Sequence, residues 1–138
     1  MDEKGQQSVE LIFIIAISIM ILLTFTLPIS KVAIENNLDM KESLNAKYCV
    51  GEIANGINHV YAQGSGSRVV LNLVADEDFH VFISSGNVNV VVKLHDNSYK
   101  MVKQSIKCGN VNTQLFLVKG ENKIIIEWIE DGVVLRKV

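Results

Sequence analysis

The chain lacks the features by which most enzymes and nucleic-acid binders are recognised. Its 13 basic and 15 acidic residues are interspersed and give a net charge of −2, so there is no basic stripe for a nucleic acid. His59, His80 and His95 do not have the spacing of a metal-binding helix motif, and no serine or cysteine lies in a nucleophile-elbow pattern. We therefore predict a protein that is not an enzyme, with no cofactor, no metal and no nucleic-acid partner.

What the chain does have is a long apolar run near its beginning. Leu11 to Leu27 contains no charged residue, and the flanking Val9 and Pro28-Ile29 bring the segment to the length of a membrane-spanning helix, about 20 residues. No small-x-small cleavage site follows the run, so we expect the helix to remain in the product. Glu10 directly precedes it, and an acidic side chain at this place is costly in lipid and usually marks function.

The residues ahead of the run resemble a known family. Lys4-Gly5-Gln6-Gln7-Ser8-Val9-Glu10, followed by uninterrupted apolar sequence, is similar to the class III (prepilin) signal peptide of archaeal type IV pilin-like proteins. In that family a membrane peptidase cuts after the glycine, which here implies cleavage between Gly5 and Gln6 and makes Glu10 the fifth residue of the mature chain. The resemblance covers about residues 3–30, and it departs from the family in one respect: Asp2 and Glu3 dilute the positive charge of the leader.

The resemblance implies a structural subunit, a major or minor pilin, of an archaeal type IV pilus-like surface filament that serves adhesion. The implied partners are copies of itself or related pilins, the prepilin peptidase, and a pilus assembly platform with its ATPase. The protein would lie in the cell membrane before assembly and in an extracellular filament afterwards, with its head domain outside the cell. The alternative is a single-span membrane-anchored protein whose extracellular β domain binds a surface ligand without polymerising.

Cleavage after Gly5 would create a positive charge with which Glu10 can pair. Cleavage creates an α-amine on Gln6, one helical turn from Glu10, so a cation and an anion begin the mature helix. The carboxylate of one subunit can meet the amine of a neighbour, and because an unpaired buried charge is penalised, this pairing would set the axial register. The alternative is an ordinary acidic residue at the headgroup level, in the first turn of the helix.

The rest of the helix is predicted to change character along its length. Pro28, the only proline, predicts a kink; the alternative is that it ends the membrane segment and starts a second helix. Farther on, apolar residues recur at intervals of three and four and predict an amphipathic helix: Ala46, Cys49, Ile53, Ile57 and Val60. We therefore divide the chain into a leader (1–5), a transmembrane or filament-core helix (6–29), its amphipathic continuation (30–63), a Gly/Ser turn (64–67) and a β-strand head domain (68–138).

The head domain is predicted to hold seven short strands separated by polar turns, at 68–74, 79–83, 88–94, 99–102, 114–118, 123–129 and 133–137. The expected fold class is α+β, a long helix followed by a small antiparallel β-sandwich or partly open barrel that covers the apolar stripe of the helix. Cys49 and Cys108 can form a disulfide that fastens head to helix, or they can be two unconnected thiols, with Cys49 a small core residue. Asp76-Glu77-Asp78 is interpreted as a solvated turn, with a calcium-type site as the alternative.

Overall fold

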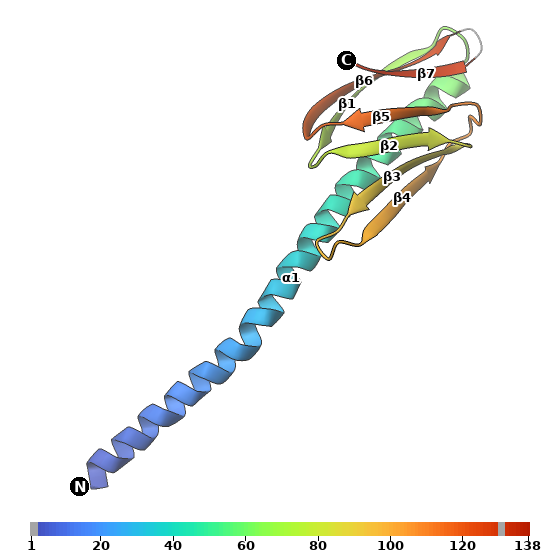
Figure 1. The fold of residues 1–138 in the computed structure, drawn as a ribbon. Helices are drawn as coiled ribbons and strands as arrows, with labels where there is room; N and C mark the ends of the chain where they lie inside the picture. The colour runs from blue at the N-terminus through green and yellow to red at the C-terminus, as the bar shows by residue number, and fades with distance from the viewer. Residues whose placement is uncertain (1–2, 130–131) are drawn as a thin grey trace. The chain divides into compact units, whose positions relative to one another are not determined.

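The computed structural model describes residues 3–129 and 132–138, with side chains from Ser8 onward. It contains one helix and, among the described residues, seven strands (Figure 1): α1 (Glu3–Gln63), β1 (Arg68–Ala75), β2 (Phe79–Ser84), β3 (Asn87–Lys93), β4 (Tyr99–Ser105), β5 (Thr113–Leu117), β6 (Gly120–Ile129) and β7 (Gly132–Lys137). The expected α+β class and the antiparallel β head are confirmed. The chain divides into two compact units, Met1–Leu38 and Asp39–Val138.

The first unit consists of the N-terminal part of α1. Pro28 lies inside this helix, which continues without interruption, so the alternative of a second helix starting after Pro28 was wrong. Because proline has no N–H, the carbonyl of Thr24 loses its usual partner four residues later. The kink itself stays a prediction.

The strands of the second unit form two antiparallel sheets. A three-stranded sheet has the order β1-β6-β7 and a four-stranded sheet the order β4-β3-β2-β5. The β2–β3 hairpin closes with two residues, Ser85 (φ 49°) and Gly86 (φ 75°), both in the left-handed region that a type I′ turn requires. In the described residues the two sheets do not close into a barrel, so the head is two sheets with open edges.

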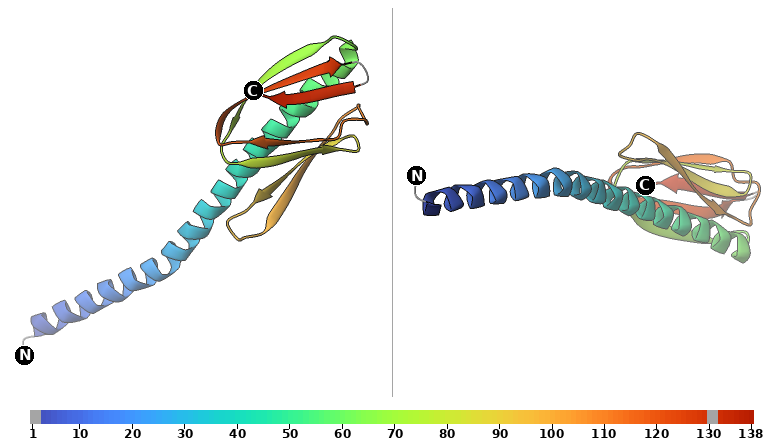
Figure 2. Two further views of the ribbon diagram at one scale, coloured as in Figure 1. Left: turned by 45° about the horizontal axis from the view of Figure 1, so that its top comes forward. Right: turned by 90° about the horizontal axis from the view of Figure 1, so that it is seen from below.

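One face of each sheet meets the apolar stripe of α1. In β2 buried and exposed residues alternate in full, because successive side chains of a strand point to opposite faces, whereas β4 has no buried residue. Figure 2 shows the strands gathered on one side of the C-terminal part of α1. The largest fully buried side chains come from the helix and from both sheets: Ile53, Ile57, Leu73, Ile83, Leu117, Ile124 and Ile126. The predicted stripe is therefore the helical half of the core.

Gly56 of α1 lies close to side chains of β1 and β6. A Cβ atom on this residue would lie 2.7 Å from Cδ1 of Ile126 and 3.0 Å from Cδ1 of Leu71. A side chain at this position would therefore have to displace the ends of Ile126 and Leu71. Gly51, one and a half turns earlier, has no such neighbour within 4 Å.

Asparagine side chains tie α1 to the strands at two levels. Asn45 donates to the carbonyl of Val74 (3.0 Å) and accepts from the backbone N–H of Asp76 (2.9 Å). Asn58 accepts from the backbone N–H of Lys107 (2.8 Å). Two of these bonds pair backbone N–H groups outside the strands, those of Asp76 and Lys107, and all three hold α1 against the sheets.

Candidate functional site

The apolar run of α1 is exposed along its whole length. Its large apolar side chains from Leu11 to Leu27 are each between 50% and 70% exposed. Among the described residues this is the one helix long and apolar enough to cross a membrane, and its apolar window has no buried residue. The hydroxyls of Ser18 and Thr24 donate to carbonyls one turn back, each at 2.7 Å, so they need no partner from outside the helix. This long apolar helix near the N-terminus is consistent with membrane anchoring.

The predicted processing and register residues lie at the start of the same helix. Gly5 and Gln6 are helical, and their side-chain surroundings lie outside the described part of the chain. Glu10 is exposed and forms no ion pair with another described side chain.

The two cysteines are not bonded to each other in this structure, which corrects the disulfide expected between Cys49 and Cys108. Both are buried free thiols. The Cys49 sulfur lies 3.7 Å from the carbonyl oxygen of Val74, and its side chain fills a position in the helix stripe against β1. The structure instead has the alternative arrangement, in which the two thiols are unconnected and Cys49 is a small core residue.

Cys49 should react slowly with thiol reagents. Burial, aided by the negative charge of Asp76, raises the pKa of its thiol to about 11. At pH 8 only about one Cys49 in a thousand would be the reactive thiolate, against roughly a quarter for an ordinary thiol. Native protein treated with iodoacetamide at pH 8 should retain an unmodified Cys49 by peptide mass spectrometry, whereas protein unfolded in guanidinium chloride should be modified rapidly. Equal modification of Cys49 in the two states would contradict its burial.

The acidic turn Asp76-Glu77-Asp78 has partners of its own chain. Asp76 lies 3.4 Å from the ammonium of Lys41, and Glu77 lies 3.0 Å from that of Lys119. Asp78 accepts from the backbone N–H of Lys119 at 2.8 Å. These contacts favour the interpretation as a turn over the calcium alternative, because the carboxylates already link this turn to α1 and to the β5–β6 connection.

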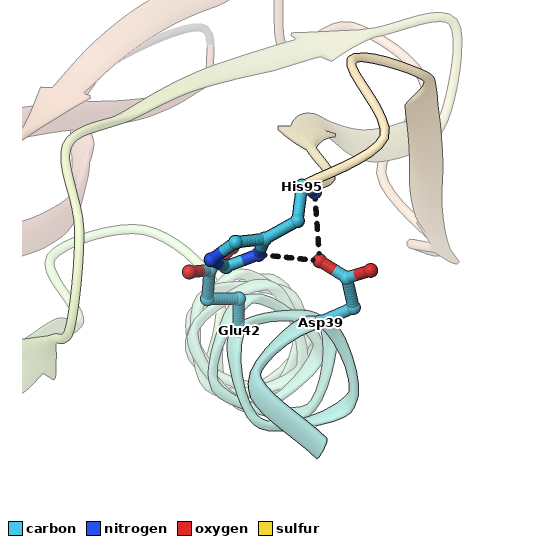
Figure 3. Close-up of side chains that lie close together, drawn as sticks. All are labelled: Asp39, Glu42 and His95. Atoms are coloured by element: carbon cyan, nitrogen blue, oxygen red, sulfur yellow. Dashed lines mark hydrogen bonds and ion pairs between the residues drawn. The ribbon is translucent and has the colours of Figure 1, made fainter. Parts of the chain in front are cut away.

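A cluster that the sequence did not predict lies where α1 passes the β3–β4 turn. Asp39 and Glu42 come from one side of the helix, and His95 comes from the turn (Figure 3). The backbone N–H of His95 donates to Oδ1 of Asp39 at 2.9 Å, and the ring Nδ1 lies 2.8 Å from the same oxygen. One ligand atom from each of the three residues lies within 4.8 Å of the others, so this cluster could hold a metal ion.

The electrostatics of the cluster follow from these contacts. First the backbone N–H of His95 and then its ring stabilise the carboxylate, which lowers the pKa of Asp39 below its usual value. The carboxylate thus stays charged in mildly acidic solution. Sequence spacing could have shown that Asp39 and Glu42 share a helix face, but 56 residues separate Asp39 from His95.

The outer face of the four-stranded sheet carries exposed aromatic side chains. His80 lies on this face of β2, and its ring is 4.6 Å from that of Phe116 and 6.4 Å from that of Phe82, measured between centroids. Phe82 is 37% and Phe116 is 42% exposed. His80 is an exposed residue of β2, and its aromatic neighbours make this face of the sheet partly apolar.

Comparison with known proteins gives no significant match: no family model, no curated protein and no solved structure is similar to this chain. Its described surface offers three features to a partner. They are the bare apolar helix headed by Glu10, the Asp39, Glu42 and His95 cluster, and the aromatic face around His80.

Proposed function

We propose that this protein is a pilin, a structural subunit of an archaeal type IV pilus-like surface filament. It is inserted in the cell membrane, cut between Gly5 and Gln6 by a prepilin peptidase, and assembled through α1 with copies of itself or related pilins. The observation that carries the proposal is the order of features in one helix: a glycine processing motif, Glu10, then an apolar run whose side chains are at least half exposed. The assembly platform and its ATPase follow from the resemblance.

The extent of the exposed helix surface favours a filament over a simple anchor. α1 has 61 residues, roughly three times what a bilayer needs, and apolar side chains remain exposed beyond the apolar run, as at Val32, Ile34 and Leu38. In the second unit, Met40, Leu44 and Tyr48 are spaced one turn apart and are 55–62% exposed. Sister helices can cover such a surface, whereas an anchor has no use for it past the membrane.

The head domain would face outward and provide adhesion. Aromatic side chains gathered on a sheet face, such as Phe82 and Phe116 around His80, suit contact with another surface, because exposed apolar patches commonly mark interaction sites. The same face would serve the alternative function, a membrane-anchored binding protein that does not polymerise. The two functions differ in the fate of the N-terminus.

Mass spectrometry of the mature protein from cells that make the peptidase tests the proposal. We expect a chain that begins at Gln6. The variant Gly5→Val, which places a branched side chain at the cut, should remain full length and stay in the membrane fraction. A wild-type chain that begins at Met1 in those cells would refute the pilin proposal and favour the anchored alternative.

A further inference from the structure

The cluster of Asp39, Glu42 and His95 is a candidate for a function that the filament proposal does not use. Among the residues that the structure describes, it is the one group of three side chains placed to ligate a single ion. We propose that it binds a divalent first-row transition ion, of which Zn²⁺ is the best match, and that the ion clamps α1 to the β3–β4 turn. The proposal is independent of whether the chain polymerises.

The geometry needs only small side-chain movements. Zinc binds nitrogen and carboxylate oxygen at about 2.0–2.2 Å, which places two ligands of one ion roughly 3.3–3.6 Å apart in a tetrahedral site. The ligand atoms of the cluster already lie within 4.8 Å of one another. Rotation of the Asp39 and Glu42 carboxylates, which are only partly buried, can close the difference.

The imidazole is held in place before any ion arrives. Two hydrogen bonds join His95 to Oδ1 of Asp39, one from the backbone N–H and one at the ring, so both the turn and the ring are oriented toward the helix. Figure 3 shows the ring lying over α1 near both carboxylates. Such preorganisation lowers the ordering cost of binding.

The donor set selects the kind of ion. One imidazole nitrogen with two carboxylate oxygens suits zinc and neighbouring transition ions, whereas calcium and magnesium prefer a shell of oxygens alone. Two negative charges also balance a divalent cation. A water molecule can complete a four-coordinate shell, as in zinc sites with three protein ligands.

A hollow beside the cluster would give an ion access to it from solvent. It has a volume of about 430 Å³, and its lining includes Glu42, His95, Glu77 and Asp78. Its lining holds three acidic side chains, Glu42, Glu77 and Asp78, against one lysine, Lys93, and is otherwise largely apolar. A cation approaching through this hollow meets Glu42 and His95 together.

The simpler reading of the cluster is a hydrogen-bonded pair between Asp39 and His95 that only ties the turn to the helix. Glu42 separates the two readings, because neither hydrogen bond to Asp39 involves it. Glu42→Gln keeps the size of the side chain and leaves that pair intact. It removes the charge that a zinc ion needs.

The test uses the full chain, purified in detergent without a polyhistidine tag and titrated with Zn²⁺ in a calorimeter. We expect one ion per chain, and an affinity lowered at least about tenfold by Glu42→Gln and more by His95→Ala. Saturating zinc should raise the Tm of the wild type and leave that of Glu42→Gln unchanged, each compared with the same protein without zinc. Co²⁺ in place of zinc should give the strong visible absorption of a tetrahedral site.

The control is His80→Ala. It removes an exposed imidazole from β2, a strand that contributes no residue to the cluster. It should bind zinc within about twofold of the wild type, since a lost ligand costs tenfold or more. The proposal is overturned if the wild type shows no saturable binding. It is also overturned if Glu42→Gln binds zinc as tightly as the wild type, or if His80→Ala loses binding to the same degree.

Discussion

Gly56→Leu should lower the free energy of unfolding of the head domain by about 2–4 kcal/mol, since overpacking a filled core typically costs 1–3 kcal/mol and sometimes more. The first added carbon would already lie 2.7 Å from Cδ1 of Ile126, which is completely buried. Three more carbons would then have to displace β6 or Leu71 of β1. The loss should appear as a Tm lower by about 10 °C or more in thermal unfolding followed by circular dichroism in detergent.

Gly51→Leu is the matched control on the same helix. Nothing lies within 4 Å of a Cβ at this position, so the variant gains helix propensity without a clash. It should be as stable as the wild type or up to about 1 kcal/mol more stable. If both leucine variants destabilise the domain equally, the close approach of α1 to β1 and β6 at Gly56 is wrong.

The fold was largely predictable because its signals are local. Alternating apolar residues gave all seven strands in the described chain, and the helix ends at Gln63 ahead of the Gly/Ser turn. The largest boundary errors are three residues each: β4 runs to Ser105 rather than ending at 102, and β6 begins at Gly120 rather than at 123. Lys119-Gly120-Glu121-Asn122 has turn residues, but the side chain of Asn122 bonds back to Val118 and Gly120, so the turn tightens and the strand starts early.

Strand order was not predictable in the same way. β1 pairs with β6 from Arg68↔Glu127 to Ala75↔Gly120, which joins segments about fifty residues apart. That pairing is selected by how both strands cover the stripe of α1, and no local pattern encodes it. The helix stripe was predictable, whereas the arrangement of strands over it was not.

The candidate sites also differ in whether their residues are close together in the sequence. The motif around Gly5 and Glu10 is contiguous, so the sequence alone brings its residues together. The contact between Asp39 and His95 depends on how the β3–β4 turn is folded against α1, and a lone histidine in a polar turn carries no signal of its partner. The disulfide expectation failed for a similar reason, because two buried cysteines can each fill the core without meeting.

Glu10→Ala should remove the protein from surface filaments while leaving both its processing and its head domain intact. In the proposed assembly, the carboxylate of Glu10 meets the α-amine of Gln6 on a neighbouring subunit within an apolar helix bundle. Removing one partner of a buried ion pair leaves the other charge uncompensated, at a cost of about 3–5 kcal/mol. That cost corresponds to an incorporation lowered by roughly two to four orders of magnitude.

The measurement is the amount of the variant in sheared surface filaments relative to the membrane fraction, read by immunoblot. Mass spectrometry should find that Glu10→Ala still begins at Gln6, which separates an assembly defect from a processing defect. Glu10→Gln should assemble almost as poorly as Glu10→Ala, because the pairing depends on the charge rather than on the size of the side chain.

Glu35→Ala is the matched control, since Glu35 is an acidic residue of the same helix that already has a partner, Lys31 at 3.9 Å one turn earlier. It should enter filaments at the wild-type level, because an exposed ion pair contributes little. Normal incorporation of Glu10→Ala would refute the register role of this carboxylate. Equal loss in both variants would mean that assembly responds to the total charge of the helix, and the specific pairing of Glu10 with Gln6 would then have to be abandoned.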